Sequence, residues 1–441
     1  EFSHKAKVSI IFEKIGIFGA VYHSVYIEMA DNTKDSILFT PFQLGPLKLK
    51  NRIIRSAAFE SMGKDFSPTR ELKDYHVSVA RGGVAMTTLA YAAVNRGAIS
   101  FNSQLWLRDE IIPAMRDMTD AIHAEGSAVG IQIGHCGNMT HWFTAGKFPV
   151  GASTGFNLYS PTFVRGLRRS EIYEIVKDFG KAVDVAYESG IDSIELHAGH
   201  GYLISQFLSP YTNHRHDEFR GSLENRMRFM NLCMDEVREA TARHNMALVV
   251  KHNMEDGFKG GIQIPESLEI ARELEKHGAD AIILTAGFVS KAPMAVMRGR
   301  IPTKCMAYYM PLKSLPQKIV ISLFGNWMIK QYDFKECYFL EDAKKFRKEL
   351  KLPLIYVGGL VSREGIEKVL DEGFECVQIA RALVNDPLFV QKLREGDMNT
   401  RSKCDHRDYC MARMYSDKMI CCHNCADQIP AKLWKEIDKI K

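Results

Sequence analysis

The sequence predicts an α/β fold, a closed (β/α)8 barrel of the TIM type, with an insertion after the sixth strand and a cysteine-rich C-terminal tail. Short apolar runs alternate with longer segments of helical period, which is typical of parallel strands joined by crossover helices. There are eight such runs. Polar residues follow several of them at their carboxyl ends, where barrels of this kind carry their chemistry. No G-x-G-x-x-G follows a strand, so a Rossmann fold is not expected.

The strands and helices are expected in strict alternation. The strands are Arg52 to Ala57, Val84 to Ala90, Ala128 to Ile133, Ser193 to His197, Ala247 to His252, Ala281 to Thr285, Leu354 to Val357 and Cys376 to Ile379. Helices are expected at Pro113 to Glu125, Ser170 to Ser189, Asn225 to Arg243, Pro265 to His277, Glu341 to Glu349 and Ser362 to Asp371. Several of these helices begin at Pro, Ser or Asn and are followed by Gly, as helix ends commonly are.

One large domain accounts for most of the 441 residues, because such barrels use more than about 200 residues around one core. We expect the barrel over residues 37–397, an N-terminal extension over 1–36 and the tail over 398–441. Met29 has the appearance of an ordinary start, so residues 1–28 are expected to lie outside the native domain. Residues 286–340, after the sixth strand, exceed what a minimal barrel needs and are expected to carry structure or function of their own.

Composition excludes several classes of partner. The chain is 46% hydrophobic and 25% charged, as in ordinary globular proteins, and its net charge of +5 forms no basic arm or stripe that would bind nucleic acid. Charged residues such as Glu13 and Glu28 interrupt the apolar run from Val8 to Ala30, so we expect neither a bilayer span nor a secretory signal, and no membrane partner. The ten cysteines, half of them crowded in the tail, favour a reducing, cytoplasmic location.

The stretch from Ser193 to Arg228 carries the main chemical signal. Strand alternation places Glu195 and His197 on one face. If the chain turns helically after His197, His200 follows at i+3 on the same side, with Tyr202 one step beyond. Two imidazoles can hydrogen-bond one oxygen, and a nearby phenol can give up a proton. The pattern therefore predicts an active site.

A metal site is the alternative for the two histidines, because H-x-x-H spacing also occurs in zinc sites. A metal in a barrel normally recruits further ligands from other strand ends. Only His252 is an inviting addition of that kind.

Inward-facing residues on the third and fifth strands are typical of a site for a flat ring. Gly130, Gln132 and Gly134 share one face of the strand, which therefore carries a single side chain. The amide of that side chain can both donate and accept hydrogen bonds, as the edge of a pyrimidine-like ring requires. Gln132 could equally plug the barrel mouth. Lys251 could stabilise negative charge on a reduced cofactor, or it could pair with Glu195 inside the barrel.

Glycines and an arginine follow the last two strands, where this fold usually seats a phosphate. Gly358 and Gly359 follow the seventh strand, and Ala380 and Arg381 follow the eighth. Bare glycine amides and a helix start attract an anion, and the Arg381 guanidinium adds a fork of donors.

These motifs resemble the old yellow enzyme family of NADH:flavin oxidoreductases, which are FMN-bearing eight-stranded barrels, over about Phe39 to Leu393. The resemblance rests on LFTPFQLGPLKLKNRIIRSA, GIQIGHCG, HAGHGYLISQFLSPYTNHRHDEFRGSLENRMRF, IYVGGL and VQIARALVNDP. It implies FMN as the cofactor, NAD(P)H as the electron donor and a small molecule as the substrate.

The resemblance also implies a role for each matching residue. Tyr202 would donate a proton, and His197 and His200 would bind the substrate carbonyl oxygen. The residues that would hold FMN border its ring, its pyrimidine edge, its N1 side or its phosphate; they are Ser56, Ala57, Ala58, Ala90, Gln132, Lys251, Gly358, Gly359, Ala380 and Arg381.

The implied activity is reduction of activated C=C bonds in α,β-unsaturated carbonyl compounds, with hydride from flavin N5. The alternatives are an iron-sulfur flavoprotein that reduces enoyl thioesters or acts like an amine dehydrogenase, and a flavin-binding protein without turnover. Tyr202 argues against the last, because binding alone does not require a proton donor.

The chain departs from the family pattern at three places. Phe59 stands where some relatives have a cysteine or threonine that tunes the flavin, and Ala380 replaces a glycine. The tail resembles the cluster-binding segment of larger dienoyl-CoA and 2-enoate reductases, but Arg407 stands where their second cysteine is expected. An iron-sulfur cluster, a zinc ion and uncoordinated thiols all remain open there. The candidate ligands are Cys404, Cys410, Cys421 or Cys422, and Cys425.

Overall fold

A computed structural model of the chain describes residues 36–157 and 162–440. Eight parallel strands close into a barrel in the order β11, β12, β13, β14, β15, β3, β6 and β7. Each begins and ends within three residues of its predicted run, so the predicted fold class is confirmed. In chain order they are β3 (Ile53–Arg55), β6 (Met86–Ala93), β7 (Ala128–Gly134), β11 (Ser193–His197), β12 (Ala247–Asn253), β13 (Ala281–Thr285), β14 (Leu354–Val357) and β15 (Cys376–Ile379).

The predicted extension over residues 1–36 lies outside the described residues except for Ser36. The expectation that residues 1–28 are not native therefore concerns a part of the chain that the structure does not describe.

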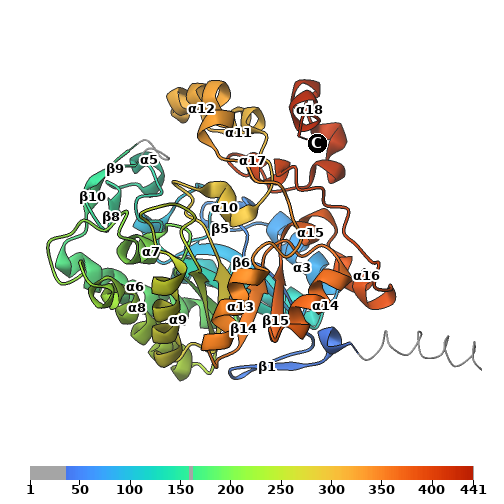
Figure 1. The fold of residues 1–441 in the computed structure, drawn as a ribbon, viewed down its shortest axis with the longest axis horizontal. Helices are drawn as coiled ribbons and strands as arrows, with labels where there is room; N and C mark the ends of the chain where they lie inside the picture. Colours follow the sequence, from blue (N-terminus) through green and yellow to red (C-terminus); the bar gives the residue numbers. More distant parts are fainter. Residues whose placement is uncertain (1–35, 158–161, 441) are drawn as a thin grey trace, which may run out of the picture.

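Apolar residues fill the barrel at the amino ends of its strands. A hairpin of β1 (Phe42–Leu44) and β2 (Leu47–Leu49) lies at this end (Figure 1), and its Leu44 and Leu49 join the apolar cluster inside the barrel. Helices cover the outer surface, so all five residues of β11 and all eight of β6 are buried. Because one end is closed by apolar side chains, the carboxyl ends are left as the place where polar groups meet a ligand.

Helices alternate with the strands as the sequence predicts. The six predicted helices agree with the structure within two residues at each end. A further helix, which the sequence did not predict, is capped by Thr69, whose Oγ1 accepts from the Leu72 N–H at 3.2 Å. The helices around the barrel are α3 (Arg70–Arg81), α4 (Ile112–Ala124), α6 (Arg169–Glu188), α8 (Leu223–Arg243), α9 (Ile264–Lys276), α13 (Leu340–Glu349), α14 (Arg363–Asp371), α15 (Arg381–Asn385) and α16 (Phe389–Glu395).

The loops near the carboxyl ends of the barrel strands contain short strands and short helices. Two of them form a hairpin after β3, and three form a small sheet in the long loop after β7. None of the helices among the described residues is both long enough and apolar enough to cross a membrane. The short elements are β4 (Gly63–Lys64), β5 (Ser67–Pro68), α5 (Trp142–Ala145), β8 (Val150–Gly151), β9 (Gly155–Asn157), β10 (Thr162–Gly166) and α7 (Leu203–Leu208).

The insertion after the sixth strand and the cysteine-rich tail pack together above the barrel (Figure 1). We call this unit, residues 286–339 and 398–440, the cap lobe. Its own apolar core joins residues far apart in the chain, and the hydroxyl oxygens of Tyr309 and Tyr409 lie 2.6 Å apart. Its helices are α10 (Pro293–Met297), α11 (Thr303–Tyr309), α12 (Leu315–Met328), α17 (Tyr409–Arg413) and α18 (Ala431–Ile437).

Buried neutral histidines in the barrel wall make stability depend on pH. Burial lowers the pKa of His252 to about 4, and Nε2 of His252 lies 2.7 Å from Ser267 Oγ. Below pH 6.5 the unfolded imidazole binds a proton that the folded one does not, so stability is complete above about pH 6.5 and is lost as the pH falls toward 4. In His252→Gln we expect the drop in free energy of unfolding between pH 7.5 and 5 to shrink by up to about 2 kcal/mol, measured by urea denaturation. An unchanged drop would contradict this.

Candidate active site

A cavity of about 1150 Å³ opens at the carboxyl ends of the barrel strands, next to the cap lobe. It collects residues from strand ends that are far apart in the chain. Every residue that the sequence predicted to bind the cofactor or to catalyse lines it, namely Ser56, Ala57, Ala58, Ala90, Gln132, His197, His200, Tyr202, Lys251, Gly358, Gly359, Ala380 and Arg381.

Glu195 is the centre of a buried polar network at the barrel mouth. Its Oε1 accepts from Lys251 Nζ at 2.7 Å and from Gln132 Nε2 at 2.6 Å, and its Oε2 accepts from Gln378 Nε2 at 2.9 Å. Ser56 Oγ in turn donates to Gln378 Oε1 at 2.9 Å. All five side chains are buried. The carboxylate thus binds together side chains from β7, β11, β12 and β15.

The network bears on both alternatives for Lys251. Pairing of Lys251 with Glu195 is confirmed by the 2.7 Å distance, and the lysine lines the cavity as well. Sequence reasoning did not select Gln378, although its signal was present. Cys376 and Gln378 are two residues apart, so both lie on the inner face of β15. A polar residue on that face, near the end of the strand, was a signal for a place at the barrel mouth.

The two histidines meet, but not through the helical turn that the sequence predicted. His200 has φ of 59°, in the left-handed region, and the chain from 198 to 202 forms no helix. The Asn253 side chain holds this turn, because its Oδ1 accepts from the His200 N–H at 3.1 Å. The rings of His197 and His200 nevertheless lie 5.0 Å apart between centroids, at 83° to each other. Histidine tolerates the left-handed region better than most residues.

Both histidines are neutral at physiological pH. Burial, followed by the nearby His200 and Lys251, holds the pKa of His197 well below its usual range, and burial lowers the pKa of His200 to about 3. Each neutral ring therefore has one N–H to donate. His200 Nε2 lies 2.9 Å from Thr285 Oγ1, a partner that sequence reasoning missed. Thr285 ends β13 on the inner face, which was its only signal.

Tyr202 lies beside this pair, at the start of α7. Its backbone N–H donates to Gly199 O at 3.2 Å, and its ring centroid is 4.7 Å from that of His197. Tyr91 packs edge-on against Tyr202, with the centroids 5.1 Å apart. The Tyr91 hydroxyl is engaged with Ser100 Oγ at 2.7 Å. Tyr202 and the two histidines therefore line one wall of the cavity.

The glycine turn after β14 forms the opposite end of the cavity. Gly359 has φ of 74°, and a Cβ there would lie 2.7 Å from a ring carbon of Tyr338. Only glycine fits on both grounds. Arg381 lies in the same part of the cavity, but its guanidinium already has protein partners. It donates to Asp408 Oδ1 at 2.6 Å and to Arg298 O at 3.1 Å.

The residues present fit FMN in three places. Gln132 and Lys251 offer an amide and an ammonium at one end, as the edge of a flavin ring requires. Gly359 and Arg381 offer an anion site at the other end. His406, which also lines the cavity, has a buried Nε2 with no hydrogen-bond partner among the described residues. A phosphate at that end would share Arg381 with the Asp408 carboxylate.

The histidine pair does not form a metal site with His252. His252 points to the outer face of β12, where its Nε2 contacts Ser267, and only a group in the tail brings three ligand atoms together among the described residues. The metal alternative for His197 and His200 is therefore wrong as the sequence framed it, because alternate strand residues face opposite sides.

The tail thiols are close together. Burial, and to a lesser degree the neighbouring Cys421 thiol, raises the pKa of Cys404, Cys410 and Cys425. Cys421 therefore lies near the other three, and Cys422 lies beside Cys421, whose thiol is the main cause that raises the pKa of Cys422. The predicted set of four with Cys421 or Cys422 stays a prediction. Four thiols match an iron-sulfur cluster in donor type and number.

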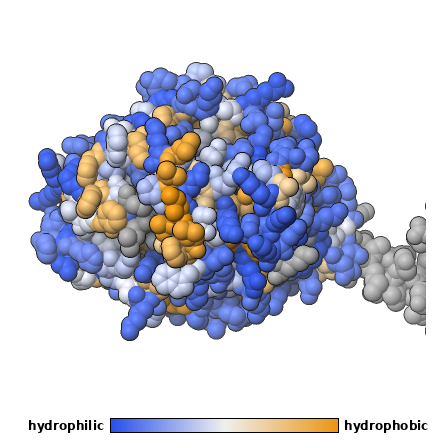
Figure 2. Space-filling view, turned by 90° about the horizontal axis from the view of Figure 1, so that it is seen from above, coloured by the Kyte–Doolittle hydropathy of each residue, from blue (hydrophilic) through white to orange (hydrophobic). Residues whose placement is uncertain are grey.

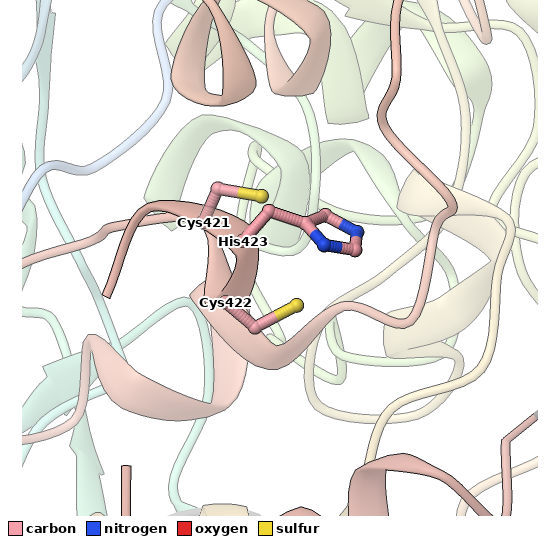
Figure 3. A group of neighbouring side chains, drawn as sticks. All are labelled: Cys421, Cys422 and His423. Carbon is pink, nitrogen blue, oxygen red and sulfur yellow. The ribbon is translucent and has the colours of Figure 1, made fainter. Parts of the chain in front are cut away.

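A smaller ligand group overlaps this set. Figure 3 shows the side chains of Cys421, Cys422 and His423 projecting to the same side, with their ligand atoms within 4.8 Å of one another. Hydrogen bonding from Cys422 is the main cause that lowers the pKa of Cys421 to about 6. A thiolate at Cys421 is the form that binds a metal.

Removing the Glu195 carboxylate tests the buried network. In Glu195→Ala the Lys251 ammonium stays buried without its partner, so we expect the free energy of unfolding to fall by about 3–5 kcal/mol in urea denaturation. Adding Lys251→Met to that variant removes the unpaired charge and should restore part of the loss. A loss below about 1 kcal/mol in Glu195→Ala would show that the network does not hold the barrel mouth.

Comparison with known proteins agrees with this geometry. The model of the NADH:flavin oxidoreductase / NADH oxidase family matches residues 37–308. The chain is 37% identical over 380 residues to 4,4'-dithiodibutanoate disulfide reductase of Rhodococcus erythropolis, covering 86% of this chain and 93% of that protein. It is 32% identical over 396 residues to a probable N-methylproline demethylase of Rhizobium meliloti (strain 1021), covering 88% of this chain and 54% of that protein. The chain thus spans about half the length of the demethylase.

A solved structure shares the fold. The old yellow enzyme homologue from Zymomonas mobilis superposes with a TM-score of 0.64 at 21% identity, over 84% of this chain and 99% of that one. Members of the matching family bind FMN and take electrons from NAD(P)H. From the closed barrel, the cavity at its mouth and these matches together, the chain belongs to the NADH:flavin oxidoreductase family, to which the old yellow enzymes belong, and it is an oxidoreductase.

Proposed function

We propose that the protein uses electrons from NAD(P)H to reduce activated carbon–carbon double bonds in α,β-unsaturated carbonyl compounds. The observation that carries the proposal is the grouping of a phenol and two neutral imidazoles on one wall of the cavity. Tyr202, His197 and His200 all line that wall, and the ring of His197 lies within 5.0 Å of the other two between centroids.

The histidines would hold the carbonyl oxygen of the substrate. Because both rings are neutral, each donates through one N–H without carrying a full charge. Such donors stabilise the negative charge that develops on the oxygen. Thr285 would fix the orientation of His200, since its hydroxyl oxygen lies 2.9 Å from Nε2.

Tyr202 would complete the reaction as the proton donor. Once reduced by NAD(P)H, bound FMN would supply the hydride that the β-carbon of the alkene receives. The electron pair of the double bond moves toward the carbonyl, and the Tyr202 hydroxyl gives its proton to the α-carbon. Solvent returns the proton to Tyr202, so atoms and charge balance over one turnover.

The cavity lining favours an apolar substrate. Phe59 and Phe101 stack with centroids 4.8 Å apart, and Met139 and Phe143 also line the cavity.

None of the ten cysteines forms a disulfide, which supports our proposal of a reducing, cytoplasmic location.

A second candidate is the reduction of an organic disulfide. It is favoured by the 37% identity to a protein named 4,4'-dithiodibutanoate disulfide reductase, which the chain covers almost completely. The same wall would serve this reaction. Two electrons from NAD(P)H, passed on through bound FMN, would break the S–S bond into two thiolates. Tyr202 would protonate one of them, and solvent would protonate the other.

Absorbance of the purified flavoprotein distinguishes the candidates. We expect a yellow protein that is bleached anaerobically by NADH or NADPH, because the cavity fits FMN and the family uses these donors. The bleached protein is then mixed with 2-cyclohexenone or with 4,4'-dithiodibutanoate. Faster return of the yellow colour with the enone supports alkene reduction, and faster return with the disulfide supports the second candidate. A protein that reacts with neither acceptor would contradict both.

Replacement of Tyr202 tests its role. In Tyr202→Phe we expect enone turnover to fall by about 10²–10⁴-fold, because the proton donor is lost while the ring remains. Bleaching by NAD(P)H should persist, because it needs no proton from Tyr202. Tyr91→Phe is the matched control, since Tyr91 lines the same cavity but its hydroxyl is engaged with Ser100. Equal enone turnover in Tyr202→Phe and the unchanged protein would show that another group donates the proton.

A further inference from the structure

An exposed apolar surface covers helix α12 of the cap lobe. Figure 2 looks down on this end of the molecule and shows a continuous hydrophobic stripe there. Trp327 is 87% exposed and Leu323 is 70% exposed, which is unusual for such side chains. The exposed apolar residues of the segment, which we call the α12 surface, are Leu312, Leu315, Ile319, Val320, Leu323, Phe324, Trp327 and Met328.

The exposure follows from the way α12 packs. Its inner face consists of Ile321 and Gly325, four residues apart, and a Cβ on Gly325 would lie 2.8 Å from Thr303 of α11. That contact already covers the side of α12 that faces the protein. The opposite side carries apolar residues at spacings of three and four, so α12 presents an apolar face to the outside as well.

Positive charge accompanies the α12 surface. The segment from Ile301 to Tyr332 contains four lysines and no acidic residue. Lys313 and Lys330 lie at the two ends of α12, and both are exposed. Apolar side chains combined with lysines alone are what an interfacial helix presents to anionic lipid headgroups.

We propose that the α12 surface docks the protein onto an anionic lipid surface. The helix has 14 residues and is therefore about 21 Å long. That is shorter than the roughly 30 Å hydrocarbon core of a bilayer, so α12 lies along the surface with its apolar side chains in the headgroup region. The proposal differs from the expectation, drawn from residues 8–30, that the chain has no membrane partner.

A second copy of the chain fits the α12 surface less well. In a symmetric dimer the same patch faces itself. Lys313 and Lys330 of one copy would then meet lysines of the other, and no acidic residue of the segment would offset them. Like charges brought together in an interface oppose association. An anionic lipid surface complements the same lysines.

Docking would turn the mouth of the cavity toward the lipid. Leu312 and Lys313 line the cavity, as does Phe143, over whose ring Lys313 Nζ lies at 5.8 Å from the centroid. Trp142, which contacts Phe143, is 66% exposed, and Phe163 of β10 is 70% exposed. Figure 1 shows α5 and β10, which carry these residues, at the same end of the barrel as α12. An apolar acceptor dissolved in the lipid would thus have a short path into the site.

Vesicle flotation of the full chain tests the proposal. The vesicles contain phosphatidylcholine alone, or phosphatidylcholine with about one-third phosphatidylglycerol. We expect the protein to float with the anionic vesicles only and to be released by high salt. In Leu323→Glu/Phe324→Glu the bound fraction should fall at least about tenfold, because charge replaces two neighbouring exposed side chains of the apolar face. Trp327 fluorescence should shift to shorter wavelength on binding to anionic vesicles.

Leu388→Glu is the matched control, because Leu388 is 40% exposed but lies outside the cap lobe. It should bind anionic vesicles like the unchanged protein. Equal binding by the Leu323→Glu/Phe324→Glu variant, or no preference for anionic vesicles, would overturn the proposal. A dimer in solution that this double variant abolishes, without vesicle binding, would assign the surface to self-association instead. Enone turnover in solution is expected to be unchanged in the double variant, so failure here is distinguishable from failure of the proposed function.

Discussion

The buried carboxylate of Glu195 is the constraint on which the site depends. A charge inside a barrel is costly unless it is paired and hydrogen-bonded. Here Lys251, Gln132 and Gln378 all bind it within 2.9 Å, and Ser56 extends the chain of contacts. The hydrogen bonds and the ion pair of the Glu195 carboxylate therefore hold one side chain from each of four strands in place. The same groups line the cavity, so the interaction that stabilises the barrel mouth also positions the groups that a flavin ring would meet.

Two different electrostatic environments lie at the two ends of the cavity. At one end, burial keeps His197 and His200 neutral, so they can donate hydrogen bonds without adding a positive charge to that of Lys251. At the other end, Arg381 is permanently charged and is balanced by Asp408 of the tail. Neutral N–H donors are suited to bind a carbonyl oxygen, and a charged guanidinium group is suited to bind a phosphate. Because these two environments are separate, a substrate carbonyl would meet the neutral histidines and the phosphate of a bound flavin would meet Arg381.

The cap lobe links the site to the surface of the molecule. Its two segments have a common apolar core, and both reach the cavity, through Leu312 of the insertion and His406 of the tail. The tail thiols near Cys421 and the exposed face of α12 lie in the same lobe. The lobe thus brings together the tail thiols, the Asp408 contact to Arg381 and the proposed lipid-facing helix, while the barrel beneath supplies the rigid frame.

The sequence by itself determined the eight strands, six of the helices and a part of the cavity lining, because periodicity, helix caps and the HAGHGY motif are local signals. It did not determine the left-handed turn at His200, the pairing of Arg381 with Asp408, or the use of Gln378 and Thr285. Nor did it show that the insertion and the tail form one lobe. These features join residues from different elements, most of them far apart in the chain. Only the tertiary structure, through closure of the barrel and packing of the cap lobe, decides which of them meet, because a local pattern fixes the face of a side chain but not its partner.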